Sequence, residues 1–265
     1  MVKNINKNLQ KLQTKGKSLF LAYDHGLEHG PEDLPDETLN PDYVFSIAEK
    51  GKFNGFIVQK GLAEKYGGSY KTNLILKVNG KTNIKNKDPY SPINCSVKKA
   101  VQLNAKAIGF TIYPGSEFEE KIYEDFRNIQ EEAHDYGLPV IAWMYPRGKS
   151  IKNDLDKNIL IRSARIGLEL GADMLKMKYN GDKETLKIMK AAAGKAKLLC
   201  AGGSRSDTSK EFLKKIEEMN ECGVDGFAIG RNIWKHEKPL KITNSVKDIL
   251  FEKKNVYEAL KRLEN

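Results

Sequence analysis

The amino-acid sequence predicts one α/β domain over residues 1–265, folded as a single (β/α)8 TIM barrel with an N-terminal helix and a C-terminal amphipathic helix. Two observations support this prediction. Eight short apolar segments alternate with stretches of helical length, and the chain has the size of one barrel domain. No Gly-x-Gly-x-x-Gly motif follows the first apolar segment, which argues against a dinucleotide-binding fold. The predicted strands are 18–23, 55–59, 74–78, 107–112, 139–143, 172–179, 197–201 and 226–230.

Helical stretches separate most of these strands. Residues 246–263 have the amphipathic pattern of a terminal helix that packs on the barrel or on a partner subunit. The polar, turn-rich segment 79–94 predicts an irregular excursion after the third strand. The other predicted helices are the opening segment, 42–50, 96–103, 117–136, 154–171, 183–197 and 210–215.

The composition limits the possible partners and location. The chain has 45 Lys and Arg against 35 Asp and Glu, a formal net charge of +10, which favours anionic substrates. Its basic tracts lack interleaved aromatic residues, so no nucleic-acid partner is expected. No apolar run approaches the length of a membrane span, and the polar segment 1–13 does not resemble a signal peptide. Three cysteines without Cys-x-x-Cys spacing predict reduced thiols and a cytoplasmic protein.

The sixth predicted strand carries Lys176 and Lys178 on one face of an apolar segment. Burial disfavours the charged form of a lysine and therefore lowers its pKa. A neutral amine can attack a carbonyl group and form a Schiff base, so we expect covalent carbonyl chemistry. Strand periodicity does not separate Lys176 from Lys178. The alternative interpretation is a strand-end lysine that extends its ammonium to solvent.

Glycine-rich turns follow the seventh and eighth predicted strands. In a barrel, the carboxyl ends of the strands form the active-site face, and the last two strands are a frequent phosphate site. Glycine lets backbone amides approach an anion closely, so we expect a phosphate site here rather than two ordinary turns. Its predicted residues are Gly202, Gly203, Ser204, Arg205, Gly230 and Arg231.

The fifth strand and its extension place Trp143 and Tyr145 on one face, next to the lysine strand. A tyrosine beside a Schiff-base lysine can carry a proton, although an aromatic pair that only closes the barrel mouth is the alternative. Arg147 suits a bidentate contact to a second phosphate, unless it forms a surface ion pair.

The first strand is followed by a segment rich in acids and histidines, Asp24 to His29. Gly26, Gly30 and Pro31 predict a loop rather than a helix here. Because the two other histidines lie elsewhere in polar segments, we expect no metal site. Asp24 is expected to bind substrate hydroxyl groups, with His25 beside it.

These motifs together resemble archaeal-type class I fructose-1,6-bisphosphate aldolases of the wider DeoC/FbaB-like aldolase family. The resemblance spans nearly the whole chain. The segments that carry it are 21–31, 59–61, 76–82, 111–116, 143–148, 175–179 and 230–234.

The resemblance implies roles that strand patterns leave open. It implies Lys176 as the Schiff-base lysine and Tyr145 as proton donor and acceptor, with Asp24 and Trp143 lining the site. It implies further that no metal or other cofactor takes part, and that the protein forms large homo-oligomers, often decamers. The C1 phosphate would be held by Gly203, Gly230 and Arg231. Lys178 is interpreted as a like charge that lowers the pKa of its neighbour.

One segment departs from the family pattern. Residues 201–205 read Ala-Gly-Gly-Ser-Arg, where Ser-Gly-Gly-Pro-Lys is expected. Both glycines are retained, so the C1-phosphate pocket is still expected, and Arg205 keeps a cation for the distal phosphate.

The expected function is reversible cleavage of fructose 1,6-bisphosphate to dihydroxyacetone phosphate and glyceraldehyde 3-phosphate, with sugar phosphates as the partners. The first alternative is a transaldolase-type 2-amino-3,7-dideoxy-D-threo-hept-6-ulosonate synthase, which shares the Asp-His-Gly start and the lysine strand. Glu28 and His29 favour the aldolase. The alternative from another class is a basic barrel that binds RNA or another anionic polymer without catalysis.

Overall fold

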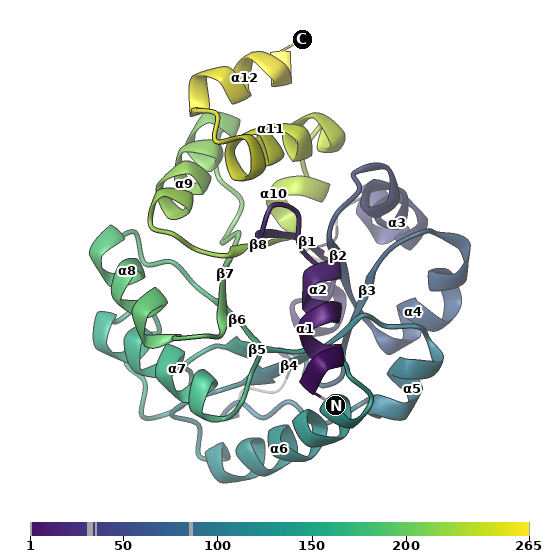
Figure 1. The fold of residues 1–265 in the computed structure, drawn as a ribbon, viewed down its shortest axis with the longest axis vertical. Coiled ribbons are helices and arrows are strands. Elements are labelled where there is room, and N and C mark those ends of the chain that lie inside the picture. The colour runs from purple at the N-terminus through teal and green to yellow at the C-terminus, as the bar shows by residue number, and fades with distance from the viewer. Residues whose placement is uncertain (1, 31–33, 35, 85–86, 265) are drawn as a thin grey trace.

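Eight parallel strands close into a barrel in a computed structural model, which describes residues 2–30, 34, 36–84 and 87–264 (Figure 1). The strands follow one another around the barrel in chain order, and β8 pairs with β1. The predicted (β/α)8 barrel is therefore confirmed. The strands are β1 Ser18–Ala22, β2 Gly55–Gln59, β3 Leu74–Lys77, β4 Ala107–Ile112, β5 Val140–Met144, β6 Met174–Met177, β7 Lys197–Ala201 and β8 Gly226–Ile229.

Helices surround the barrel on its outer side (Figure 1). Apolar side chains between the strands and these helices form the larger part of the core. The surrounding helices are α3 Pro41–Lys50, α4 Lys60–Tyr66, α5 Val97–Gln102, α6 Glu119–Asp135, α7 Lys157–Glu169, α8 Lys183–Ala192, α9 Ser209–Glu221 and α11 Pro239–Glu252. The remaining helices are α1 Val2–Lys11, α2 His25–Glu28, α10 Arg231–Trp234 and α12 Val256–Glu264, with 3-10 turns at Asp36–Leu39 and Gly67–Ser69.

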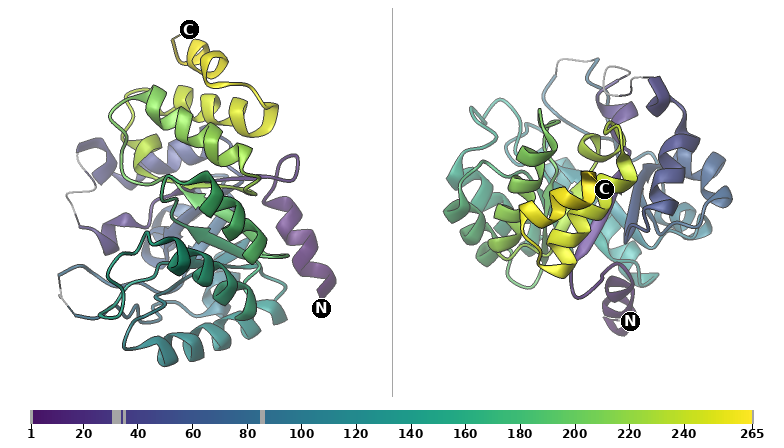
Figure 2. Two further views of the ribbon diagram at one scale, coloured as in Figure 1. Left: turned by 90° about the vertical axis from the view of Figure 1, so that its left-hand side faces the viewer. Right: turned by 90° about the horizontal axis from the view of Figure 1, so that it is seen from above.

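A second, smaller core fills the inside of the barrel. It consists of inward-facing strand residues such as Phe20, Ile57 and Ile141, together with Leu12 from the segment just after α1. Leu12 is fully buried, so the end of α1 closes the barrel at the amino-terminal ends of the strands. The opposite end is left for the loops that carry polar residues. In Figure 2, α1 projects from the barrel at the amino-terminal end of the chain.

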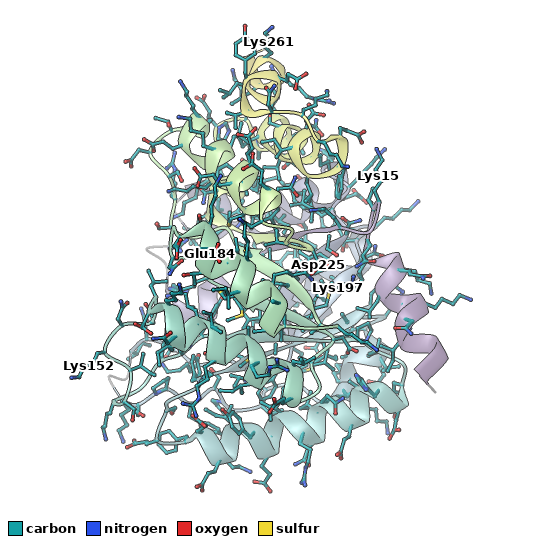
Figure 3. All side chains as sticks on the ribbon, turned by 60° about the vertical axis from the view of Figure 1, so that its left-hand side comes forward. Lys15, Lys152, Glu184, Lys197, Asp225 and Lys261 are labelled. Atoms are coloured by element: carbon teal, nitrogen blue, oxygen red, sulfur yellow. The ribbon has the colours of Figure 1, made fainter. Side chains whose placement is uncertain are left out.

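Charged side chains cover the outer surface in Figure 3, as the composition predicts. One charged residue, Asp225, also connects two neighbouring strands. Asp225 accepts a hydrogen bond from the backbone of Leu198 at 2.8 Å and pairs with Lys190 and Lys197. This carboxylate links β7 to the start of β8 at the amino-terminal end of the barrel.

The predicted single helix over 246–263 is wrong, because the chain turns at Lys253. This residue adopts a left-handed conformation with φ 57°, which ends α11. The Asn255 side chain then accepts a hydrogen bond from the backbone of Glu258 at 3.0 Å and starts α12. Arg262 pairs with Asp248 at 3.0 Å, so α12 folds back onto α11 at one end of the molecule (Figure 2). The excursion predicted after β3 is confirmed, because the described part of 79–94 holds no helix or strand, only an isolated bridge between Asn79 and Ile93.

Closure of the barrel depends on Gly226, where β8 pairs with Ser18 of β1. Its φ is 153°, and an added Cβ would lie 2.0 Å from the Ser18 carbonyl oxygen. We predict that Gly226→Ala lowers the free energy of unfolding by about 3 kcal/mol or more. Gly223→Ala is the control, because its φ of 80° is also positive but no atom lies within 4 Å of an added Cβ. The control is expected to cost about 1 kcal/mol.

Denaturant unfolding of both variants measures the difference. Equal losses of stability would show that backbone conformation, and not the contact with Ser18, is what makes Gly226 necessary.

Candidate active site

A cavity of about 540 Å³ opens at the carboxyl ends of the strands. This volume lies in the range of sites for small molecules. Side chains and turns at the ends of β1, β5, β6, β7 and β8 line it, and α9 closes one side. Most of the predicted site residues lie in this wall: His25, Tyr145, Arg147, Lys176, Lys178, Gly202, Gly203, Ser204, Gly230 and Arg231.

Lys176 lies on β6 between Trp143 of β5 and Leu199 of β7. The residue is only 5% exposed, although its side chain reaches the cavity. Burial lowers the pKa of Lys176, and Arg231 lowers it further, while Asp24 and Glu28 act in the opposite direction. The neutral amine that a nucleophile requires is therefore favoured here.

Lys178 has a different environment, because β6 ends at Met177. Its side chain is 31% exposed and forms an ion pair with Asp154. The interpretation that Lys178 lowers the pKa of Lys176 finds no support, since desolvation is the largest cause and Arg231 is the like charge that contributes. Lys178 instead adds a paired cation to the cavity wall.

Asp24 is buried two residues after the end of β1, near Lys176, His25 and Lys77. Burial raises the pKa of Asp24, but Lys176, His25 and Lys77 outweigh it, so the pKa is lowered and the carboxylate is favoured. The neighbouring His25 Nδ1 lies 3.7 Å from Asp24 Oδ1. Burial lowers the pKa of His25 to about 4, which keeps the imidazole neutral at neutral pH.

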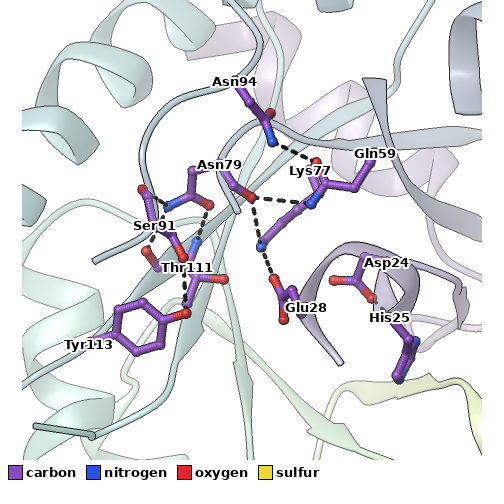
Figure 4. Close-up of polar contacts among 10 residues, drawn as sticks. All are labelled: Asp24, His25, Glu28, Gln59, Lys77, Asn79, Ser91, Asn94, Thr111 and Tyr113. Atoms are coloured by element: carbon purple, nitrogen blue, oxygen red, sulfur yellow. Dashed lines mark hydrogen bonds and ion pairs between the residues drawn. The ribbon is translucent and has the colours of Figure 1, made fainter. Parts of the chain in front are cut away.

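The loop predicted for residues 24–29 is wrong, because one helical turn, α2, forms there. The backbone N–H of His29 donates to the carbonyl oxygen of His25 at 2.8 Å. A turn this short is not stable in isolation, so contacts with the barrel must hold it. Asp24 lies at the start of this turn and Glu28 at its end, and Figure 4 shows Glu28 paired with Lys77.

Trp143 lies inside the barrel and is almost completely buried. Its ring lies 4.8 Å from Lys176 Nζ and 5.5 Å from Lys77 Nζ, within range of cation–π attraction. The indole crosses β4 above Gly109, where an added Cβ would lie 2.4 Å from the ring. Trp143 therefore supports Lys176 from within the barrel and does not form part of the cavity wall.

Tyr145 follows β5 and donates its backbone N–H to the carbonyl oxygen of Ile112 at 3.0 Å. Its ring packs against the inner core, and the Arg147 guanidinium lies 5.6 Å from the ring centre. Burial raises the pKa of Tyr145, and the carboxylates of Asp24 and Glu28 raise it further. The phenol is therefore protonated and can donate a proton into the cavity.

The turns after β7 and β8 are joined by hydrogen bonds. Asn232 donates to the carbonyl oxygens of Gly202 at 2.9 Å and Ser204 at 3.0 Å. Arg231 donates to the carbonyl oxygen of Gly203 at 3.5 Å. These contacts hold the two glycine turns as one wall. Sequence reasoning did not assign Asn232 to the site, although it lies in the motif Gly230-Arg231-Asn232.

Lys77 and Glu28 are two further residues near the site that sequence reasoning did not assign. The Lys77 side chain is fully buried at the end of β3 and pairs with Glu28 Oε1 at 2.8 Å (Figure 4). Its Nζ also donates to the carbonyl oxygen of Asn79 at 3.0 Å. The signal in the sequence was a lysine within the apolar strand 74–78, the same signal that drew attention to Lys176.

The family model of DeoC/LacD family aldolases matches residues 18–236. The chain belongs to this family. It is 43% identical to the class 1 fructose-bisphosphate aldolase of Thermoproteus tenax over 96% of this chain and 97% of the relative. A relative from Methanocaldococcus jannaschii, named fructose-bisphosphate aldolase/6-deoxy-5-ketofructose 1-phosphate synthase, is 38% identical over 97% of this chain and 89% of its own length.

A solved structure of an archaeal fructose-1,6-bisphosphate aldolase, with its catalytic lysine covalently bound to the carbinolamine intermediate, is also similar. It has a TM-score of 0.89 and 42% identity, and the match covers 93% of this chain and 99% of the solved one. The predicted resemblance to archaeal-type class I aldolases is confirmed.

Arg205 lies outside the cavity of this aldolase. It lines a neighbouring cavity of about 240 Å³ together with Asp207, Asn232 and His236. The structure therefore does not bring Arg205 to the other predicted site residues. The basic side chains that line the main cavity are those of Arg147, Lys176, Lys178, Lys215 and Arg231.

The part of the chain that the structure describes contains no group of three His, Cys, Asp or Glu side chains arranged to hold a metal ion. None of its helices is long and apolar enough to cross a membrane.

The Trp143 indole occupies the space that Gly109 leaves free, so a side chain at position 109 should move the indole. We expect Gly109→Ala to displace the indole from Lys176 and to reduce aldolase activity at least 10-fold, since a misplaced site commonly costs that much. Gly61→Ala is the control, because no atom lies within 4 Å of an added Cβ there.

Steady-state assays and the tryptophan emission spectrum measure the two effects. Full activity in Gly109→Ala would show that the contact between Trp143 and Lys176 is dispensable.

Proposed function

We propose that this chain is a class I fructose-bisphosphate aldolase that cleaves fructose 1,6-bisphosphate reversibly to dihydroxyacetone phosphate and glyceraldehyde 3-phosphate. The observation that carries this proposal is Lys176, a buried lysine with a lowered pKa whose side chain reaches the cavity. The relatives and the similar solved structure bear the same activity in their names.

The first half of the reaction forms the Schiff base. Neutral Lys176 attacks the C2 ketone, and a proton moves from nitrogen to oxygen to give a carbinolamine. The Tyr145 phenol, which is protonated in the free site, donates its proton to the C2 hydroxyl. This hydroxyl leaves as water, which forms the protonated imine and leaves Tyr145 as a phenolate.

The second half breaks the carbon chain. The phenolate takes the proton of the C4 hydroxyl, the C3–C4 bond breaks, and the bonding electrons enter the imine to form an enamine. Glyceraldehyde 3-phosphate leaves as the aldehyde. The Tyr145 phenol then protonates C3 and becomes a phenolate. Water hydrolyses the protonated imine to dihydroxyacetone phosphate and the neutral lysine, and the proton released by this step returns to the Tyr145 phenolate. Asp24 lies beside Lys176 as a carboxylate and can accept hydrogen bonds from substrate hydroxyl groups.

The two substrate phosphates are proposed to bind to different residues of the cavity wall. The C1 phosphate would contact the backbone amides of the turns at Gly203 and Gly230 and the Arg231 side chain. The distal phosphate would contact Arg147 and Lys178. Several basic side chains in one cavity, Arg147, Lys178 and Arg231 among them, favour a bisphosphate substrate over that of the aminodideoxyheptulosonate synthase. A binding barrel without catalysis is disfavoured, because a buried Lys176 serves no purpose in polymer binding.

The predicted homo-oligomer and the predicted cytoplasmic location stay predictions. Sedimentation of the purified protein measures the first, and a pentamer or decamer is the expected mass.

Reductive trapping tests the nucleophile. We expect borohydride reduction with dihydroxyacetone phosphate to add one reduced triose to Lys176, located by peptide mass mapping. Lys176→Met should abolish the adduct, whereas Lys178→Met should keep it on Lys176. An adduct on Lys178, or none in the wild-type protein, would contradict the proposal.

Removal of one hydroxyl tests the proton carrier. We expect Tyr145→Phe to lower kcat for cleavage at least 100-fold with a much smaller change in KM, because the phenol acts only in bond making and breaking. Tyr179→Phe is the control, since Tyr179 lines the same cavity but interacts with Glu218 and Lys183 rather than with the lysine site. Equal effects of the two substitutions would remove Tyr145 from the mechanism.

A further inference from the structure

Lys77 and Glu28 form a second buried acid–base pair beside the reacting lysine. The Lys77 side chain is 0% exposed and that of Glu28 is 16% exposed. Desolvating an ion pair is costly, and an apolar pair of similar size often gives equal or greater stability. A pair retained inside the barrel at this point therefore calls for an explanation beyond stability.

The pair connects three structural elements. Lys77 belongs to β3, Glu28 to α2, and the Lys77 ammonium also lies 5.5 Å from the ring of Trp143 on β5. The same ring contacts Lys176 at 4.8 Å. The Trp143 indole therefore lies close to both buried lysines. The helical turn α2 carries Glu28, which pairs with Lys77, and also His25, which follows Asp24 in the chain.

The polar surroundings of the pair are themselves fixed (Figure 4). Asn79, whose carbonyl oxygen accepts from Lys77, accepts through Oδ1 from the backbone of Thr111 at 2.8 Å. Its side-chain amide donates to the carbonyl oxygens of Thr111 at 3.0 Å and Ser91 at 3.3 Å. The position of the Lys77 ammonium is therefore set by the ends of β3 and β4.

Electrostatics gives the pair a second consequence. The charge of Glu28 raises the pKa of Lys176 and, after burial and Asp24, that of Tyr145. A bare carboxylate at this place would favour the inactive ammonium form of Lys176. The ammonium of Lys77, 2.8 Å away, offsets that charge. The charged and titratable groups that act on Lys176 are Asp24, His25, Glu28 and Arg231. Lys77 and Tyr145 interact in turn with Asp24, and Lys178 is paired to Asp154.

We infer that the Lys77–Glu28 ion pair positions the catalytic machinery: it ties α2 to β3, and Lys77 cancels the charge that Glu28 would otherwise present to Lys176. Both are positioning residues, since they act through Lys176 and not on the substrate. This inference rests on the proposed function, because it assigns the pair to the Schiff-base step.

The test measures how the rate of Schiff-base trapping depends on pH. The probe is dihydroxyacetone phosphate with cyanoborohydride, and the adduct on Lys176 is followed by intact mass. The midpoint is the pH at which the trapping rate reaches half of its maximum. Glu28→Gln removes a charge that holds a proton on Lys176, so this midpoint should fall by about half a unit or more. Lys77→Met leaves Glu28 uncompensated, so the midpoint should rise by a similar amount.

The double variant Lys77→Met/Glu28→Gln removes both charges and should return the midpoint to within a few tenths of a unit of the wild type. Loss of structure alone would not move two midpoints in opposite directions. Lys149→Met and Glu117→Gln are matched controls, because this exposed pair has the same 2.8 Å separation and lies away from the cavity. Neither control should shift the midpoint.

Shifts in the same direction, or no shift in either single variant, would overturn the inference. If Lys77→Met does not fold, as judged by circular dichroism, a lowered midpoint in Glu28→Gln and its recovery in the double variant decide the matter. The wild-type protein separates the two proposals. A wild type that forms no adduct refutes the proposed function, whereas a wild-type adduct with unshifted variants refutes only the role of the pair.

Discussion

The Lys176 side chain is almost completely buried, and the polar groups of the barrel mouth are arranged around its amine. The closed strand order places the lysine between Trp143 and Leu199 and removes its solvent. Asp24 and Glu28 act against the loss of its proton, while Arg231 and desolvation promote it. The same desolvation keeps Tyr145 protonated and His25 neutral. A lysine with a lowered pKa, a protonated phenol and a carboxylate therefore lie within one small volume because of their burial.

Much of the fold follows from patterns that are local in the sequence. Each strand is a short apolar run, and eight such runs separated by helical stretches leave few alternatives to a closed barrel. Lys176 and the glycine turns could be found for the same reason, since a lysine in an apolar strand and paired glycines at strand ends are visible without any partner. The strand pattern alone could not separate Lys176 from Lys178, because their different environments depend on β6 ending at Met177 and on Asp154 from another segment.

The residues that escaped prediction depend on contacts distant in the chain. Glu28 and Lys77 are 49 positions apart, and nothing in either segment identifies the other as its partner. The turn α2 forms in a segment whose glycines favour a loop, because the barrel supplies the contacts that so short a helix lacks. The break between α11 and α12 was missed for a similar reason: the amphipathic pattern continues through Lys253, while Asp248 and Arg262 pair only after the chain has turned.

The bare backbone of Gly109 has a wider consequence. Barrel interiors are normally filled by layers of side chains, and alternate strands contribute to each layer. Here β4 contributes no side chain at one level, and a tryptophan from β5 occupies the vacant space. The lysine of β6 and the lysine of β3 consequently share one aromatic surface across the barrel. Another barrel scaffold that is to carry this site must therefore have glycine at the position of Gly109 in addition to the reacting groups. Any side chain there would leave no room for the indole.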